Sequence, residues 1–249
     1  MLEEFLREIG VYQLTIAFFI VFIASTAQSV FGMGWGMIAA PLLALLNPQL
    51  IPGTIVFLGF FAALYPSIKY YKDVDWYIFK PAITGRIIGS IFAGWITAYI
   101  VASGKIEIVL GCVLLISIFI SIFTIKKIKQ NARNHFIAGT VSGVLGTVVG
   151  VGGTPMGIIY QNENPVMVRA NNNLFFTVGS IASVSILLIA GVMKSYHIIY
   201  GFLLLPPLFT ASFTAKYFIK YGNRILKPYI LSICTISSII LMLRGLEVL

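Results

Sequence analysis

The chain has 249 residues, of which 59% are hydrophobic and 10% are charged, and its formal net charge is +9. A soluble domain carries about 25% charged residues, so the composition, with a mean hydropathy of +0.97, excludes an ordinary water-soluble fold and predicts an all-α integral membrane protein. In such a protein the positive charge indicates cytoplasmic loops facing anionic lipid, and it is no sign of nucleic acid as a partner.

The first half of the chain is predicted to hold a helical hairpin followed by three membrane-spanning helices. A glycine-rich hinge, Gly32-Met33-Gly34-Trp35-Gly36, interrupts an apolar stretch and is followed by a short apolar run to Pro41. The arm after the hinge is too short to cross about 30 Å of hydrocarbon alone. Apolar continuity, without the alternation of barrel strands, predicts helices throughout. The predicted elements of this half are the hairpin 12–46 and the spans 52–70, 80–101 and 105–125.

The second half repeats this order. Its hinge reads Gly150-Val151-Gly152-Gly153-Thr154-Pro155 and stands about half a chain length after the first. A break that recurs in corresponding places of two halves points to a transporter built from internal repeats. The chain is therefore divided into 1–130 and 131–249, each a glycine-hinged hairpin plus three transmembrane helices. In the second repeat these are the hairpin 135–162 and the spans 172–193, 197–219 and 228–246.

The basic residues decide how each hinge is placed in the membrane. A hinge is either a break within one span or the turn of a hairpin that enters and leaves on the same side. With hairpins, one side holds twelve of the 17 Lys and Arg residues and the other side holds four. Cytoplasmic loops are rich in Lys and Arg, so hairpins are favoured, and both termini are predicted to lie outside a multi-pass cell inner (plasma) membrane. The two halves then have opposite orientations, as inverted repeats require.

The two hinges are the first candidates for a binding site. Backbone amides and carbonyls cannot stay unpaired in lipid, so a loop at membrane depth must be buried in protein or line a wet cavity. Where such a loop opens a helix, free N–H groups and the positive end of the helix dipole favour an anion. Close helix packing is the alternative explanation for the glycines. The predicted substrate-binding glycines are Gly32, Gly34, Gly36, Gly150, Gly152 and Gly153.

Arg86 is the second candidate, because it falls within the predicted span 80–101. A buried arginine in a membrane helix indicates function, and an anion is its natural partner. Its helical face is small and slightly polar, so we expect that face to point into the bundle. Snorkelling of the side chain to the headgroups is the alternative. The acidic residues map to loops or span ends, so no carboxylate within the membrane is predicted to pair with Arg86.

Polar side chains near the two breaks complete the predicted site. Gln28 and Ser29 precede the first hinge, Thr154 belongs to the second, and the run 171–173 opens the span 172–193. Successive helical residues point about 100° apart, so at most two of the three asparagines can face one cavity, and we assign Asn172 and Asn173 to the site. A capped helix start near the surface is the alternative for this run. Trp35 is a candidate gate or, equally, a packing residue.

No catalytic chemistry is visible in the sequence. It holds no nucleophile–base pair, carboxylate dyad, phosphate loop or metal-ligand spacing, and we predict no enzyme activity, no cofactor and no bound metal.

The doubled hinge resembles the motif of the TauE/SafE sulfite exporter family, which comprises TauE-like membrane transporters. The stretch from Gly32 to Pro41 matches the first family motif, except that Trp35 stands where a small residue is usual. In the second motif Gly150, Gly152 and Gly153 match, Thr154 replaces a glycine and the proline comes early. The resemblance covers essentially the whole chain. It implies export of sulfite and of organosulfur anions such as sulfoacetate.

Together these observations predict a transporter that exports a small anion, sulfite or a related organosulfur anion, by alternating access between inverted repeats. An anion channel of the same fold and a non-transporting membrane scaffold subunit are the alternatives. The predicted partners are the small anion and the lipid bilayer. The sequence leaves open whether the chain forms a homodimer.

Overall fold

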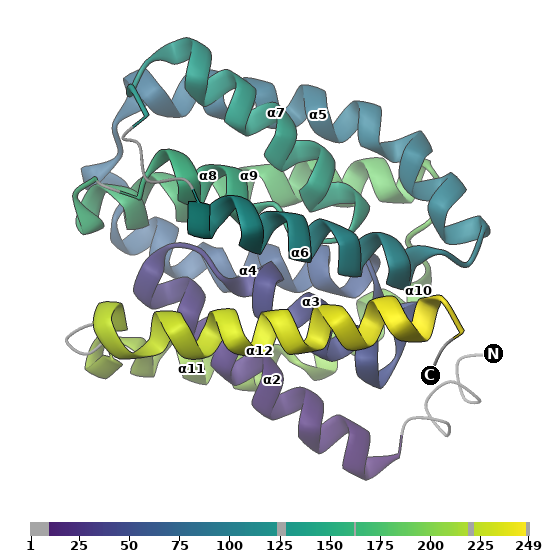
Figure 1. Ribbon diagram of the computed structural model, residues 1–249. Helices are drawn as coiled ribbons and strands as arrows, with labels where there is room; N and C mark the ends of the chain where they lie inside the picture. The colour runs from purple at the N-terminus through teal and green to yellow at the C-terminus, as the bar shows by residue number, and fades with distance from the viewer. Residues whose placement is uncertain (1–9, 124–127, 162, 219–221, 248–249) are drawn as a thin grey trace.

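The computed structural model describes residues 10–123, 128–161, 163–218 and 222–247 (Figure 1). Within these ranges the chain forms helices and no strand, which confirms the prediction of an all-α protein. Two short 3-10 helices lie at Pro48–Leu50 and Tyr71–Asp73. The α-helices are α2 (Val11–Phe31), α3 (Trp35–Leu46), α4 (Gly53–Lys69), α5 (Trp76–Ala102), α6 (Ile106–Phe123), α7 (Ala132–Val148), α8 (Gly153–Ile159), α9 (Pro165–Ile189), α10 (Ser195–Leu203), α11 (Leu205–Phe218) and α12 (Gly222–Gly245).

Three of the described helices, α2, α5 and α9, are long and apolar enough to cross a membrane, and the pair α10 and α11 is a fourth candidate span. The predicted hairpin 12–46 is occupied by α2 and α3, and the predicted hairpin 135–162 by α7 and α8. In Figure 1, α2 begins and α3 ends on the right of the view, whereas α7 begins and α8 ends on the left. The predicted segments 105–125, 135–162 and 197–219 each include residues outside the described ranges.

The predicted start of the 172–193 span is wrong, because α9 already begins at Pro165. Proline suits the first helical position, and the side chain of Asn164 caps this end by accepting a hydrogen bond from the N–H of Val166 at 2.8 Å. The asparagine run 171–173 therefore lies inside a helix, fully buried, and is not a capped helix start near the surface.

The predicted 197–219 span is not one straight helix. It is divided into α10 and α11, which meet at Leu204 with a bend of 47°. Pro206 and Pro207 fall in the first turn of α11, where proline needs no intrahelical donor but prevents α10 from continuing unbroken.

Helices of the two halves pair with each other across the molecule. The main contacts join α5 with α7, α2 with α11, α4 with α9 and α6 with α12. In each pair one helix comes from residues before 130 and the other from residues after it. Exchanging the halves leaves this set of pairs unchanged. When α10 and α11 are counted as one element, the first element of each half contacts the fourth element of the other half, the third contacts the third, and the fifth contacts the fifth.

The closest of these contacts, between α5 and α7, depends on glycine. A Cβ atom at Gly85 of α5 would overlap the backbone oxygen of Phe136, and one at Gly139 of α7 would overlap that of Ala82. The two backbones are therefore in direct contact, as small residues at helix spacing predict in membranes. In this way α7, which leads to the second hinge, is held against the helix that carries Arg86.

The opposite face of α5 is apolar and exposed. Ile91, Phe92 and Trp95 are 58%, 64% and 84% exposed, whereas Ser90 and Thr97 on the other face are completely buried. A soluble helix has the reverse distribution, so this pattern fits a helix whose outer face contacts lipid. It confirms that the small, polar face of α5 points into the bundle.

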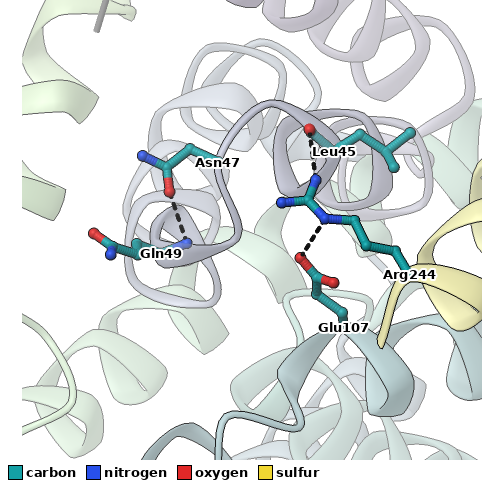
Figure 2. Close-up of polar contacts among 5 residues, drawn as sticks. All are labelled: Leu45, Asn47, Gln49, Glu107 and Arg244. Carbon is teal, nitrogen blue, oxygen red and sulfur yellow. Dashed lines mark hydrogen bonds and ion pairs between the residues drawn. The ribbon is translucent and has the colours of Figure 1, made fainter. Parts of the chain in front are cut away.

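The far end of α3 is fixed by α12 and α6 (Figure 2). Arg244 donates a hydrogen bond from Nη1 to the backbone oxygen of Leu45 at 3.2 Å, and its Nε forms an ion pair with Glu107 at 3.4 Å. Beyond α3, Asn47 Oδ1 accepts a hydrogen bond from the N–H of Gln49 at 2.9 Å. A cation near the last carbonyls of a helix complements its dipole, so this contact stabilises the end of α3 away from the hinge.

Candidate functional site

The two glycine hinges come into contact inside the bundle. The first break covers Gly32 to Gly34, and the second covers residues 149–152. A Cβ atom at Gly36, in the first turn of α3, would overlap the backbone oxygen of Gly150, and one at Gly153 would lie 4.0 Å from the backbone nitrogen of Gly34. Gly32, Gly34 and Gly150 have positive φ angles of 73°, 117° and 78°, which favour glycine. Both breaks are therefore turns whose backbones touch.

A small cavity of about 30 Å³ lies at this contact. One water molecule needs about 10–15 Å³ by the same measure, so the cavity has room for a ligand of a few heavy atoms. It is lined by residues of both hinges and of the helices around them, namely Gln28, Gly34, Trp35, Gly36, Ile55, Val56, Gly59, Arg86, Gly146, Gly150, Gly152, Gly153, Phe176 and Ser180. Eight of the thirteen residues predicted for the site, including the gate candidate Trp35, thus border one space.

Arg86 supplies the positive charge of this cavity. Its side chain is 3% exposed, so it does not snorkel to the headgroups. Nη1 donates hydrogen bonds to the backbone oxygen and the Oγ of Ser142, at 2.8 and 2.9 Å. The guanidinium carbon lies 5.1 Å from the ring centre of Phe175 and 5.5 Å from that of Phe176. These contacts hold the guanidinium in place from one side.

Three glycines from three elements make room for the Arg86 side chain. A Cβ atom at Gly146 of α7 would lie 2.7 Å from Nη1, and one at Gly152 of the second hinge would lie 2.5 Å from it. A Cβ atom at Gly179 of α9 would overlap Nε. We call Gly146, Gly152 and Gly179 the glycine cradle. A side chain at any of its positions would displace the guanidinium.

The charge of Arg86 has no acidic partner among the described residues. No ion pair joins it to a carboxylate there, its Nε is buried without a hydrogen bond, and Nη2 donates none to the residues that the structure describes. An uncompensated buried charge is costly, and in a membrane it indicates a ligand or pathway for ions. The arrangement at the hinge contact can therefore accept an anion.

Gln28 lines the cavity, but its amide is already bonded to protein. Nε2 donates to Oδ1 of Asn173 at 3.0 Å and to the backbone oxygen of Gly32 at 3.3 Å. Oε1 accepts from the N–H of Trp35 at 3.3 Å. Gln28 therefore holds the first hinge against α9, and Asn173 is engaged in the same contact. These two residues position the hinge.

Trp35 closes the cavity on the side of α4. Its Nε1 donates a hydrogen bond to the backbone oxygen of Ile55 at 2.9 Å, and its ring lies against Gly59, where a Cβ atom would be 3.2 Å from Nε1. The residue is 6% exposed. It fills space between the first hinge and α4, and this placement is compatible with both the gate and the packing interpretation.

The remaining predicted residues lie outside the cavity lining. Gly32 packs against the backbone of Arg169, where a Cβ atom would be 2.8 Å from its Cα. Ser29, Thr154 and Asn172 are buried, and their polar side-chain atoms have no hydrogen-bond partner among the described residues.

Six lining residues were not predicted from the sequence, namely Ile55, Val56, Gly59, Gly146, Phe176 and Ser180. The sequence does not single out Gly146 and Gly179, because glycine is common in membrane helices and helix packing is its ordinary role there. The available signal was the spacing of Gly139, Gly143 and Gly146, which marks one face of α7 as free of side chains. Ser142, which bonds Arg86, borders that face.

A model of the family described as "Sulfite exporter TauE/SafE" matches residues 17–241 of the chain. The match includes both hinges and Arg86, and it ends within α12. No match was found among curated proteins or among solved structures.

Proposed function

The chain belongs to the TauE/SafE sulfite exporter family, a family of membrane transporters, and on this premise we propose that it exports a small sulfur oxyanion, sulfite or a related organosulfur anion, through the cavity at the hinge contact. The single observation that carries this proposal is Arg86, a buried cation without an acidic partner among the described residues, placed where the two hinges touch.

The chemistry of the cavity supports an anion as its ligand. Arg86 donates but cannot accept hydrogen bonds, and the first-turn amides of Gly36 and Met37 in α3 have no acceptor within their own helix. Although the N–H of Trp35 at the start of α3 donates to Oε1 of Gln28 at 3.3 Å, this start borders the cavity and carries the positive end of the helix dipole. Because α8 has only 7 residues, we expect its start to contribute less positive electrostatic potential to the cavity than the start of α3. A volume of about 30 Å³ suits an ion of few heavy atoms.

Alternating access between two inverted repeats is the transport mechanism that we propose. The helix pairs are unchanged when the halves are exchanged, and the two hairpins begin at opposite ends of the molecule in Figure 1. Both features support inverted repeats that move against each other around a fixed site. With the basic loops in the cytoplasm, we propose that both termini lie on the outer side of the inner membrane.

The membrane potential is sufficient to drive export. With a negative cytoplasm, one negative charge that leaves the cell gains about 2.3 kcal/mol per 100 mV. No carboxylate borders the cavity, so a uniport is the simplest mechanism compatible with its described lining.

Transport of radiolabelled sulfite into proteoliposomes tests this function. The variant Arg86→Ala should lower flux at sub-saturating sulfite by about 10- to 150-fold, because one hydrogen bond to a charged group contributes about 1.5–3 kcal/mol. Lys80→Ala is the matched control, because it removes a positive charge from an exposed position of the same helix and should leave flux unchanged. Undiminished, saturable sulfite flux in Arg86→Ala would remove Arg86 from the site.

The same assay separates the alternative functions. A transporter shows flux that saturates with sulfite, whereas an anion channel of the same fold conducts without saturation and a scaffold subunit gives no flux above empty liposomes. Sulfate, thiosulfate and a cation serve as competing or control ions. Trp35→Ala tests the gate interpretation, because removal of a gate converts saturable flux into a leak, while removal of a packing residue lowers stability alone.

A further inference from the structure

Buried polar atoms without a partner gather on α9 beyond Phe176, outside the cavity. Asn172 is completely buried, and neither Nδ2 nor Oδ1 has a hydrogen-bond partner among the described residues. Three residues earlier, Nε of Arg169 is buried and unpartnered, although its Nη1 donates to the backbone oxygen of Val30 at 3.3 Å. Such atoms in a native fold indicate a ligand or water that takes the free positions.

Of the asparagines 171–173, Asn172 alone lacks a partner for its amide nitrogen among the described residues, whereas Oδ1 is unpartnered in both Asn171 and Asn172. Nδ2 of Asn171 donates to the backbone oxygen of Met167 at 3.1 Å, and Nδ2 of Asn173 donates to that of Arg169 at 2.8 Å. Each thereby satisfies its amide nitrogen within the preceding turn of α9. The same bond is available in principle to Asn172, but its amide nitrogen is not engaged in it. Asn172 is thus held as a free donor and acceptor.

The unpartnered groups form a row that leads toward the cavity. Arg169, Asn172 and Phe176 are spaced by three and four residues, which places them on one face of α9. Phe176 lines the cavity, and its Cζ is 3.9 Å from the Cβ position of Gly153. From Arg169 to Phe176 the helix rises by about 10 Å. The row therefore begins near the N-terminal end of α9 and ends at the Phe176 ring.

A further unpartnered polar group lies in α8, directly after a residue that lines the cavity, Gly153. Thr154 comes directly after Gly153, and its hydroxyl is buried and unpartnered as well. Two elements that border the cavity, α8 and α9, thus carry unsatisfied polar groups.

We propose that Asn172 and Arg169 form an entry subsite, where the transported oxyanion binds on the cytoplasmic side before it passes Phe176 and reaches Arg86. The amide nitrogen of Asn172 and Nε of Arg169 supply the donors, and the ring of Phe176 separates the two anion positions. This subsite rests on the proposed function and extends it, because it adds a first anion-binding position to the transport path before the position at Arg86. It also identifies Phe176 as the barrier that must move during transport.

Replacement of Asn172 by leucine tests the subsite. An unpaired buried amide can be replaced by an apolar group of similar size without loss of stability, so Asn172→Leu should unfold at the same temperature as the wild type or a higher one. Radiolabelled sulfite flux is measured in both directions across proteoliposomes in which the protein has a uniform orientation. The half-saturating concentration on the cytoplasmic side should rise about tenfold, and that on the opposite side should change less than about twofold.

Asn171→Leu is the matched control, because it makes the same change one position away and breaks only a bond to the preceding turn. Its half-saturating concentrations should equal those of the wild type. The subsite is refuted if Asn172→Leu transports with unchanged half-saturation from both sides, or if it unfolds at a lower temperature than Asn171→Leu. A wild type without saturable sulfite flux refutes the proposed function itself, and the subsite with it.

Discussion

Gly179→Ala tests whether the glycine cradle fixes the position of Arg86. A methyl group at this position overlaps Nε and lies 3.0 Å from the guanidinium carbon, whereas ordinary contacts begin at 3.4 Å. Overpacking of a buried site costs about 1–3 kcal/mol. In a helix interior, however, alanine is favoured over glycine by about 0.8–1 kcal/mol. The net effect on stability therefore depends on whether the Arg86 side chain is present.

A double-mutant cycle separates the two contributions. In the wild-type background the overpacking cost less the helix gain should lower the free energy of unfolding by about 0–2 kcal/mol, and in the Arg86→Ala background the gain alone should raise it by about 1 kcal/mol. The helix gain is common to both backgrounds, so the coupling energy equals the overpacking cost of about 1–3 kcal/mol, which is measurable by reversible denaturation in detergent micelles. Flux should fall in Gly179→Ala, because a displacement of about 1 Å in a binding group can cost about 100-fold. Equal effects of Gly179→Ala in both backgrounds would refute the reasoning.

Four further variants test the hinge contact and its supports. Gly36→Ala should abolish flux and lower the unfolding temperature, because its methyl group overlaps the backbone oxygen of Gly150, whereas Gly153→Ala, with ordinary contacts near 4 Å, should retain the fold. Gln28→Glu keeps the acceptor for the Trp35 N–H but loses the donor to Asn173, and it should destabilise the protein by about 1–3 kcal/mol in a denaturation titration. Arg244→Ala should cost less than about 1 kcal/mol in the same titration, since Arg244 is 44% exposed.

The sequence predicts the parts of the site whose residue types are unusual for their surroundings. A doubled glycine break in an apolar chain and one arginine on a small helical face suffice to identify both hinges and Arg86 as candidate site residues. Both predictions depend on local pattern and on the general cost of unpaired polar groups in lipid. The structure places Gly36 against Gly150 and buries Arg86 beside them.

Other features depend on contacts that no local pattern encodes. The sequence predicts the start of α9 too late because Arg169 resembles a loop charge, although it lies one turn inside a helix that begins at Pro165. Gln28 and Asn173 are 145 residues apart, so their hydrogen bond follows from the packing of α2 on α9. This bond engages the side-chain amides of both residues, which the sequence analysis assigns to the substrate site. Gly179 acquires its role only because Arg86 extends across to α9.

The glycine cradle also bears on how the chain enters the membrane during synthesis. Arg86 belongs to α5, but its walls come from α7, the second hinge and α9, which are synthesised later. A bare arginine near the middle of an inserting helix costs about 2.5–3.5 kcal/mol on translocon scales. Until the later helices arrive, we expect α5 to be shifted so that its arginine stays near water. Final burial of the Arg86 guanidinium would then coincide with assembly of the two halves. In a chain shortened to the first half, α5 would not reach its final depth in the membrane.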